Sequence, residues 1–463
     1  MDGRDSEGAA GGAGLTYTIR ITLDETSPPL WRRVDVASSL TLDVVHEVIQ
    51  VVVGWTDSHL HRFASAPGHS DRTRYYHAPY DVAEGDDGTP EEQVRLGDVL
   101  AEVGDRLHYQ YDYGDDWRHT LELDAVGPPH DHQSYARCTD GDRPGPPEDC
   151  GGVHGYELIT GATDPDHPQH AQLAAAFIDL YGGEVDPGDF ELVPFSLDAI
   201  NRELERRDLT PSPDLGPVPE PLAELLAHVY EPQLRRRLFR LIADADLEAP
   251  SAPGGPGRET AARMTDPYRW LFDRVGTDGI KLTAAGYLPP VHVRAAVDDL
   301  GLDAVWIGAG NRKHDTLPVL ALRESAQEVG LLRKHRGRLL TTARGRAVAG
   351  DPVELWHHLA QRVPLGSRDA AARQAGLVLL LAVAAGATDG VYALAADVLA
   401  ARGWRVEGRP LDGPTAGRLL WDNVAMLRRI GALTATGGAR WPGEPTSEGI
   451  AFARSALITW TAR

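Results

Sequence analysis

The sequence predicts an α+β protein: a mixed β-sheet with one main helix in the amino-terminal part, followed by a mostly α-helical carboxy-terminal half. Three observations predict this fold class. Short segments before residue 127 alternate apolar and polar residues, as half-buried strands do. Residues 41–54 interrupt them with apolar residues at helical spacing. Beyond residue 219, helical spacing becomes the commoner pattern.

The first expected elements are two strands and the main helix. Tyr17–Leu23 alternates sides, and a second strand is expected to begin near Leu30. A helix should follow over residues 41–54, with Thr41 as its N-cap and Gly54 as its stop. The β-branched residues of this segment favour a strand, so the helix prediction depends on the spacing of its apolar residues.

Further strands complete the expected sheet. They are predicted at residues 59–65 and 72–78, and a long hairpin is predicted at residues 106–126. The hairpin should turn near Gly114–Asp116, because glycine and aspartate suit positive φ angles. The order strand, strand, helix and further strands is similar to a β-grasp arrangement.

Charge and composition limit the compartment and the partners. Residues 264–463 contain 25 basic and 19 acidic residues, a net charge of +6. The total net charge is −22, so residues 1–263 have a net charge of −28. The front half should therefore repel phosphate backbones. Two cysteines, no apolar leader in residues 1–14 and a longest apolar run of Gly376–Ala387 predict a cytoplasmic protein without a bilayer-spanning helix.

The stretch Tyr111–Leu121, YDYGDDWRHTL, gathers charged residues and a histidine in the hairpin. It can be a turn with a charged tip and cross-strand contacts, or part of a ligand site. His59 and His61 are expected on one face of a strand, where imidazoles and carboxylates can bind a divalent metal. Two ligand sets stay open: His59, His61, Asp112 and His119, or Cys138, Cys150 and His154 with His130 and His132.

Residues 15–205 resemble the plasmid pRiA4b ORF-3-like family, which is also met as a passenger protein of insertion elements. The resemblance is carried by PPLWRRV (Pro28–Val34), GWTDSHLHRF (Gly54–Phe63), YDYGDDWRHTLEL (Tyr111–Leu123), PPEDCGGVHGYE (Pro146–Glu157) and the closing helix FSLDAINREL (Phe195–Leu204). It implies an α+β fold and no particular reaction. It also marks a polar family-motif cluster: His59, His61, Asp112, Asp115, Trp117, His119, Glu148, Asp149 and Tyr156.

Three roles for this cluster stay open. The residues can form a buried hydrogen-bond network that pins residues 146–157 against the sheet. They can bind a metal, a small ligand or a protein. They can also catalyse, and the alternative function is then a metal-dependent hydrolase that uses His59, His61, Asp112, Asp115 and His119. No nucleophile-elbow, Walker or Rossmann motif is present in the sequence.

The carboxy-terminal half repeats a pattern of helix, strand, turn, strand and helix. Thr-x-x-Gly occurs at Thr283, Thr342 and Thr446, where threonine can cap a new helix. Residues 321–348 and 421–457 share the longer pattern, with turns at Gly337 and at residues 437–438. This order is similar to winged-helix modules, so two winged-helix-like units are expected.

The first expected wing is basic and can contact phosphates: Arg333, Lys334, Arg336 and Arg338, with Arg344 nearby. The second wing carries only Arg440, and no helix has the Arg/Asn/Gln-rich face of a base reader. We therefore expect a protein partner first, with DNA or RNA as the alternative, and no contact with membranes.

Prolines at residues 209–222 and 249–261 predict linkers. The expected organisation is a loose tail at 1–14, an α+β domain at 15–208, linkers flanking a helical bridge at 209–262, a winged-helix-like unit at 263–365, and a helical pair with a second such unit at 366–463. The predicted function is a mobile-element-associated binding or adaptor protein that is not an enzyme. No cofactor is expected, and a divalent metal is the alternative.

Overall fold

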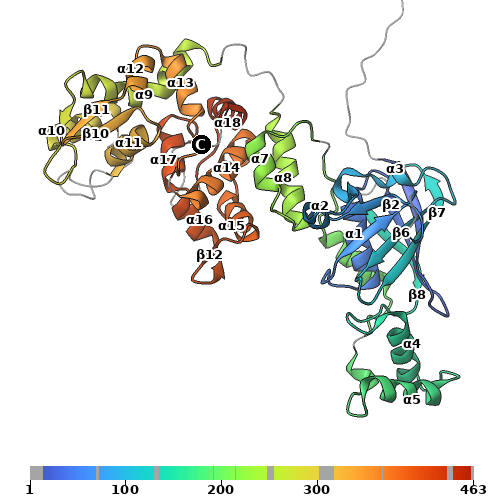
Figure 1. Cartoon of the computed structure of the whole chain (residues 1–463). Coiled ribbons are helices and arrows are strands. Elements are labelled where there is room, and N and C mark those ends of the chain that lie inside the picture. Colours follow the sequence, from blue (N-terminus) through green and yellow to red (C-terminus); the bar gives the residue numbers. More distant parts are fainter. Residues whose placement is uncertain are drawn as a thin grey trace, which may run out of the picture. The chain divides into compact units, whose positions relative to one another are not determined.

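The structure is a computed structural model of the chain. It describes residues 14–68, 72–129, 135–190, 192–213, 215–247, 255–301, 317–367, 369–434 and 442–459. The chain divides into two compact units, residues 1–212 and residues 213–463. The sheet lies in the first unit, and helices dominate the second (Figure 1). The predicted α+β class and the mostly helical second half are confirmed, whereas the finer domain boundaries stay predictions.

The first unit contains a mixed sheet of eight strands in the order β5-β4-β3-β6-β7-β1-β2-β8. Only β4 and β5 are parallel. The order differs from a β-grasp arrangement, because β1 lies between antiparallel β2 and β7 and has no parallel neighbour. The strands are β1 (Thr16–Leu23), β2 (Leu30–Ala37), β3 (His61–Ala64), β4 (Tyr75–His77), β5 (Thr89–Pro90), β6 (Arg106–Tyr111), β7 (Trp117–Gly127) and β8 (Ala136–Asp142).

The main helix, α1 (Leu42–Val53), forms as predicted, and every one of its residues is buried. Packing on all sides explains why a segment so rich in valine is helical, since tertiary contacts override the local preference for a strand. Gly54 ends the helix with φ 102°, and its N–H bonds to the carbonyl of Gln50. The side chain of Thr41 makes no capping hydrogen bond, contrary to the prediction.

The first unit contains further helices: α2 (Pro79–Glu84), η1 (Glu91–Gln93), α3 (Leu96–Val99), α4 (Gly152–Thr163), α5 (His170–Tyr181), η2 (Pro187–Asp189) and α6 (Leu197–Arg206). The closing helix α6 was expected. Ser196 caps it by accepting a hydrogen bond from the amide of Ala199, and its buried residues Ile200 and Leu204 share one face.

The predicted hairpin is formed by β6 and β7, and its register determines which motif residues face inward. Tyr111 lies opposite Trp117, and Tyr109 lies opposite His119. All four side chains are buried, because alternate residues of both strands point into the core. His119 therefore belongs to the aromatic core and not to the charged tip of the turn.

The second unit is built from helices around one apolar core. Most of α14 is buried, which agrees with the prediction of a buried helix near residues 376–387. No helix within the described ranges has the length and apolar character needed to cross a membrane. The helices are α7 (Glu220–Leu226), α8 (Pro232–Ala245), α9 (Arg258–Val275), α10 (Pro290–Leu300), α11 (Leu317–Glu328), α12 (Ala343–Val348), α13 (Pro352–Ala360), α14 (Ala370–Ala384), α15 (Val391–Ala401), α16 (Gly413–Leu419), α17 (Trp421–Arg429) and α18 (Ser447–Thr459).

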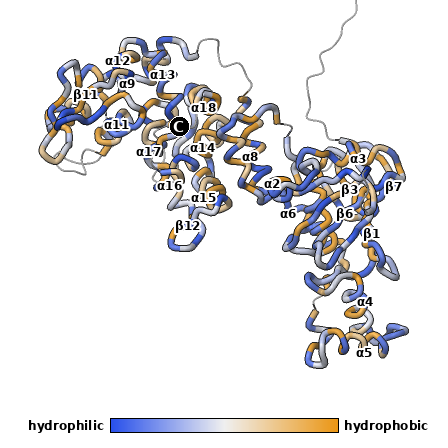
Figure 2. Tube along the Cα trace, in the orientation of Figure 1, coloured by the Kyte–Doolittle hydropathy of each residue, from blue (hydrophilic) through white to orange (hydrophobic). Residues whose placement is uncertain are grey.

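Two small sheets accompany these helices. One has the order β10-β11-β9, with β9 (Ile280–Lys281), β10 (Leu332–His335) and β11 (Arg338–Thr341), and all its pairs are antiparallel. The other pairs β12 (Arg405–Val406) with β13 (Arg409–Pro410). Both strand pairs turn at exposed polar residues, and Figure 2 shows hydrophilic and hydrophobic segments alternating along the trace of this unit.

Two of the three predicted threonine caps form. Thr342 accepts a hydrogen bond from the amide of Gly345 at the start of α12, and Thr446 accepts one from Gly449 at the start of α18. Thr283 instead accepts from the amide of Tyr287 in a turn, and no helix begins there. The predicted second wing turn, at residues 437–438, lies outside the described residues.

Candidate functional site

His59 lies outside the strand that contains His61, contrary to the sequence prediction. Strand β3 begins at His61, so the two-residue alternation of a strand does not extend back to His59. The His61 side chain enters the core, whereas His59 lies in the preceding loop with a side chain that is 25% exposed. The two imidazoles therefore have separate surroundings.

Three carboxylates surround the imidazole of His59. Its Nε2 atom lies 3.2 Å from Asp149 Oδ1, 3.6 Å from Asp112 Oδ2 and 3.8 Å from Glu148 Oε2. This Nε2 atom is buried and makes no aligned hydrogen bond. We call these four residues the His59 cluster. The Asp149 side chain is 76% exposed, so the cluster opens to solvent on that side.

The end of β6 positions Asp112. Its backbone has φ 52°, and its amide donates to the carbonyl of Leu60. The Oδ1 atom accepts a hydrogen bond of 2.9 Å from the amide of Gly114, a local turn contact that stabilises aspartate in the left-handed region. The other carboxylate oxygen is directed to His59. The turn chemistry predicted for this hairpin therefore also orients a cluster residue.

The loop of residues 146–151 brings Glu148 to the same place. Trp55 donates its indole N–H to the carbonyl of Pro146. Glu148 Oε1 accepts hydrogen bonds from the Thr56 amide at 2.9 Å and from the Tyr111 hydroxyl at 3.1 Å. Burial and the neighbouring Glu148 carboxylate raise the pKa of Tyr111, so this hydroxyl stays a donor. These contacts join the loop to the end of α1 and to β6.

The same loop approaches the hairpin turn closely. Asp115 Oδ2 accepts a 2.9 Å hydrogen bond from the amide of Gly151, just before α4. A Cβ atom on Gly152 would lie 2.6 Å from the backbone oxygen of Asp115, so only glycine fits without a shift. Tyr156 donates its hydroxyl to the carbonyl of Pro144. Asp115 and Tyr156 therefore hold the loop in place and do not join the His59 cluster.

His61 belongs to a second group, which we call the buried histidine network: His46, Asp57, His61, Glu91 and Tyr109. The rings of His46 and His61 stack in parallel with centroids 3.5 Å apart. His46 Nε2 lies 2.9 Å from Asp57 Oδ1, and His61 Nε2 lies 2.9 Å from Glu91 Oε2. The Tyr109 hydroxyl lies 2.8 Å from His46 Nδ1, so an Nε2–H tautomer of His46 satisfies both contacts.

Burial decides the charges in this network. It lowers the pKa of His46 to about 4, and the nearby His61 adds to the effect, so His46 is neutral at pH 7. Burial alone would lower the pKa of His61 too, but the Glu91 carboxylate raises it. Burial raises the pKa of Glu91, which His61 offsets only in part. His46 and Asp57 were not singled out from the sequence, because nothing local indicates that they meet.

Trp117 and His119 lie in the aromatic core and do not join the His59 cluster. The His119 ring meets Trp55 edge-on with centroids 5.3 Å apart, and neither ring nitrogen has an aligned hydrogen-bond partner. Burial lowers the pKa of His119 to about 3. Of the predicted metal set His59, His61, Asp112 and His119, the fold therefore brings together only His59 and Asp112.

The cysteine set is not assembled within the described ranges. Cys138 and Cys150 are both buried free thiols, and burial raises their pKa values to about 11 and about 12. His154 is exposed on α4, and no metal-sized group that includes these three residues occurs in the described part of the chain. His130 and His132 lie outside the described residues.

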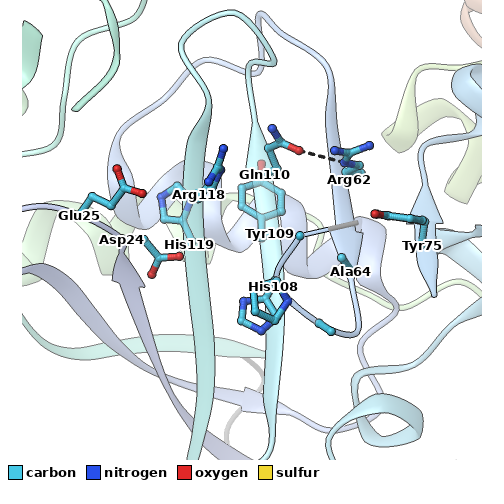
Figure 3. A pocket seen from close by; sticks show the side chains of 13 residues that line it. Asp24, Glu25, Arg62, Ala64, Tyr75, His108, Tyr109, Gln110, Arg118 and His119 are labelled. Carbon is cyan, nitrogen blue, oxygen red and sulfur yellow. Dashed lines mark hydrogen bonds between the residues drawn. The ribbon is translucent and has the colours of Figure 1, made fainter. Parts of the chain in front are cut away.

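One pocket, with a volume of about 410 Å³, lies on the outward face of β3, β6 and β7 (Figure 3). Some of its polar side chains already have partners: Arg62 donates to Gln110, and Arg118 pairs with Asp116. Thr120 donates to Asp24, whose pKa is raised by burial. Figure 3 shows these outward side chains beside the strands, and the His59 cluster does not line the pocket.

The predicted basic residues of the second unit fall into two groups. Arg333, Lys334 and Arg336 are exposed on the β10–β11 hairpin. Arg338 instead donates to the carbonyls of Asp278 and Gly279, and Arg344 donates to His358. The first three therefore make no such contacts, and Arg344 is exposed although its Nε donates to His358.

Comparisons with known proteins find similarity over part of the chain. The family model described as "Plasmid pRiA4b ORF-3-like protein" matches residues 15–193. The uncharacterised protein y4hQ of Sinorhizobium fredii (strain NBRC 101917 / NGR234) is 32% identical over 162 residues, which cover 33% of this chain and 76% of that protein. The crystal structure of MM3350, a protein of unknown function from Methanosarcina mazei Go1, is 28% identical, with a TM-score of 0.30, and covers 39% of this chain and 99% of its own.

Proposed function

We propose that this chain, which belongs to the plasmid pRiA4b ORF-3-like family through residues 15–193, is a non-enzymatic binding or adaptor protein. The carboxy-terminal half binds the partner, and the partner is a protein. The word plasmid in the family description supports an association with mobile elements. The observation that carries the proposal is the exposed basic hairpin β10–β11.

The order of elements around this hairpin supports a winged-helix-like unit. Helix α9, strand β9, helices α10 and α11, and the β10–β11 hairpin follow one another, and the sheet order is β10-β11-β9. The hairpin turns at Arg336 and Gly337, both with positive φ, which gives a tight protruding wing. Many partners can dock on such an exposed wing.

Charge on the hairpin and on the preceding helix favours a protein partner. Arg333, Lys334 and Arg336 are exposed and have no ion pair within the described residues. Helix α11 exposes Glu324 and Glu328. These carboxylates would repel the phosphates that a wing and its helix contact together on nucleic acid, whereas a protein surface can complement both charges.

The test uses the scarcity of lysine. The chain has three lysines, and Lys334 is the one on the wing. Amine-reactive cross-linking of the full chain in a lysate of cells that produce it should join Lys334 to a protein. The variant Arg333→Glu/Arg336→Glu should lose that product. The control Arg405→Glu/Arg409→Glu reverses two charges on the exposed β12–β13 hairpin and should keep it.

A second arm measures fluorescence anisotropy of labelled duplex DNA at low salt. Wing-dependent binding of DNA that weakens steeply as the salt concentration rises would show that the partner is nucleic acid and not a protein. If neither arm gives a wing-dependent product, the binding function of this half is wrong.

A metal-dependent hydrolase is the second candidate, favoured by the solvent-open His59 cluster. Its residues would be His59, Asp112, Glu148 and Asp149, because His61, Asp115 and His119 have other contacts. Hydrolysis of nitrophenyl phosphate or acetate by the full chain with Mn²⁺, lost in His59→Ala, would support it. Activity equal in both proteins would exclude it.

A further inference from the structure

We propose that the His59 cluster is a binding site for one divalent metal ion. The ligands are His59 Nε2, Asp112 Oδ2 and Asp149 Oδ1, with Glu148 Oε2 at the margin. The site is independent of the basic hairpin, which lies in the other unit.

The distances are those between ligands of one ion. Atoms bonded to a common ion at about 2.1 Å are separated by about 3.0 Å at a right angle and about 3.4 Å in a tetrahedron. His59 Nε2 lies 3.2 Å from Asp149 and 3.6 Å from Asp112. All three ligand atoms lie within 4.8 Å of one another. Since none of these contacts is an aligned hydrogen bond, His59 Nε2 is a buried polar atom without a partner.

The charges also require compensation. In the described part of the chain, Asp112, Glu148 and Asp149 form ion pairs only with His59, and none of them pairs with lysine or arginine. Three carboxylates around one imidazole leave an excess of negative charge at neutral pH, in a place where Asp112 is 92% buried. A divalent cation would remove that excess.

The other atoms of the ligands are already oriented. Asp112 Oδ1 accepts from the Gly114 amide, and Glu148 Oε1 accepts from the Thr56 amide and the Tyr111 hydroxyl. These hydrogen bonds leave Asp112 Oδ2 directed to His59, as outer hydrogen bonds orient the ligands of bound metals. Glu148 Oε2, in contrast, also accepts a hydrogen bond of 3.2 Å from the Tyr111 hydroxyl. Asp149 makes no hydrogen bond among the described residues and can adjust to the ion.

The buried histidine network is a poorer site, although His46, Asp57 and His61 also lie close together. There the ring nitrogens already bond to Asp57, Tyr109 and Glu91 at 2.8–2.9 Å. An ion would have to break these contacts, and those with Tyr109 and Glu91 lie in the core.

The ligand set indicates the class of ion. One imidazole with two or three carboxylate oxygens suits Mn²⁺ or Zn²⁺ better than a hard ion such as Ca²⁺, which prefers oxygen alone. The exposed side of Asp149 leaves room for water in the remaining coordination positions.

Calorimetric titration of the metal-stripped full chain with Mn²⁺ and with Zn²⁺ tests the proposal. The wild type should bind one ion per chain. Asp149→Asn should weaken binding at least about 10-fold, because it removes a charged ligand from an exposed position that asparagine fits at φ 56°. Asp116→Asn is the matched control, since Asp116 also has positive φ, lies in the hairpin that contributes Asp112 and pairs with Arg118. Its affinity should equal that of the wild type.

A second variant, Asp112→Asn, keeps the oxygen that accepts from Gly114, so its fold is preserved while a ligand charge is lost. It too should bind at least about 10-fold more weakly. Saturable binding that is unchanged in both variants would overturn the proposal, as would a wild type that binds neither ion. Loss of binding in Asp116→Asn as well would also overturn it.

Discussion

His59 and His61 are two residues apart, yet they represent two kinds of polar site. His61 is fully enclosed: its Nε2 contacts Glu91, and its ring stacks on His46. His59 faces three carboxylates, has no aligned hydrogen bond, and opens to solvent through Asp149. The buried histidine network is complete by itself, whereas the His59 cluster lacks a positive charge. One sequence motif can therefore contain both a structural network and a binding site.

Removal of Glu91 should have the largest effect. In the variant Glu91→Ala, His61 loses its carboxylate inside the core, and loss of one partner of a buried pair costs roughly 3–5 kcal/mol. Hydrogen exchange of the β6 and β7 amides in the full chain reports the stability of this unit. The exposed Glu102→Ala should change it by less than about 0.5 kcal/mol. A similar change in both variants would show that the network adds no stability.

The second largest effect should be the destabilisation of the first unit by acid. An unfolded histidine has a pKa near 6.5, whereas burial lowers the pKa of His46 to about 4 and that of His119 to about 3. Between these values the unfolded chain binds protons that the folded chain does not, so stability falls as the pH falls. At pH 5 each histidine contributes a loss of about 2 kcal/mol. The raised pKa values of His61 and Glu91 act in the opposite direction.

The variant His119→Phe isolates one part of this effect. Its loss of stability between pH 7 and pH 5, measured by hydrogen exchange of the β6 and β7 amides, should be about 2 kcal/mol smaller than that of the wild type. His154→Phe, at an exposed position of α4, serves as the control and should match the wild type. Equal losses in all three proteins would contradict the acid response assigned to His119.

Gly152→Ala should have an intermediate effect, because the new methyl group would meet the Asp115 backbone and the residue has φ 70°. We expect about 1–2 kcal/mol of destabilisation of the loop that carries Glu148 and Asp149. Gly104→Ala shares positive φ but has open space around it, so it separates backbone strain from the clash. Hydrogen exchange in α4 measures the effect at Gly152, and hydrogen exchange in β7, where the Leu123 carbonyl accepts from the Gly104 amide, measures the effect at Gly104. Equal effects would mean that the close approach is unimportant.

Asp149→Asn should have the smallest effect on stability. The side chain is 76% exposed and makes no hydrogen bond among the described residues, so the free energy of unfolding should change by less than about 0.5 kcal/mol without added metal. Thermal unfolding in a chelator measures this change. A loss of several kcal/mol would show that Asp149 stabilises the fold.

The predictable part of the fold was local. The spacing of apolar residues identified α1, and the Gly-Asp steps identified the β6–β7 turn, because both depend on neighbouring residues. The sheet order depends on contacts between distant strands, such as β1 with β7, which no local pattern specifies. The β-grasp expectation failed for this reason.

The candidate site was predictable only in part. Asp112 was identified from its hairpin, and Glu148 and Asp149 from the family resemblance. His61 and His119 were assigned to the metal set for two reasons. The alternation rule was applied to His59, two residues before β3 begins, and the hairpin register was unknown. His46 and Glu91 are separated from His61 by 15 and 30 residues, so no spacing rule could connect them.

The most direct test of the division between the two sites is an anomalous difference map from crystals of the full chain soaked in Mn²⁺. We expect one strong peak between His59 Nε2, Asp112 Oδ2 and Asp149 Oδ1, at about 2.1 Å from each. We expect no peak between His46 and His61. Density for the ion in the buried histidine network, or none beside His59, would overturn the division between the two sites.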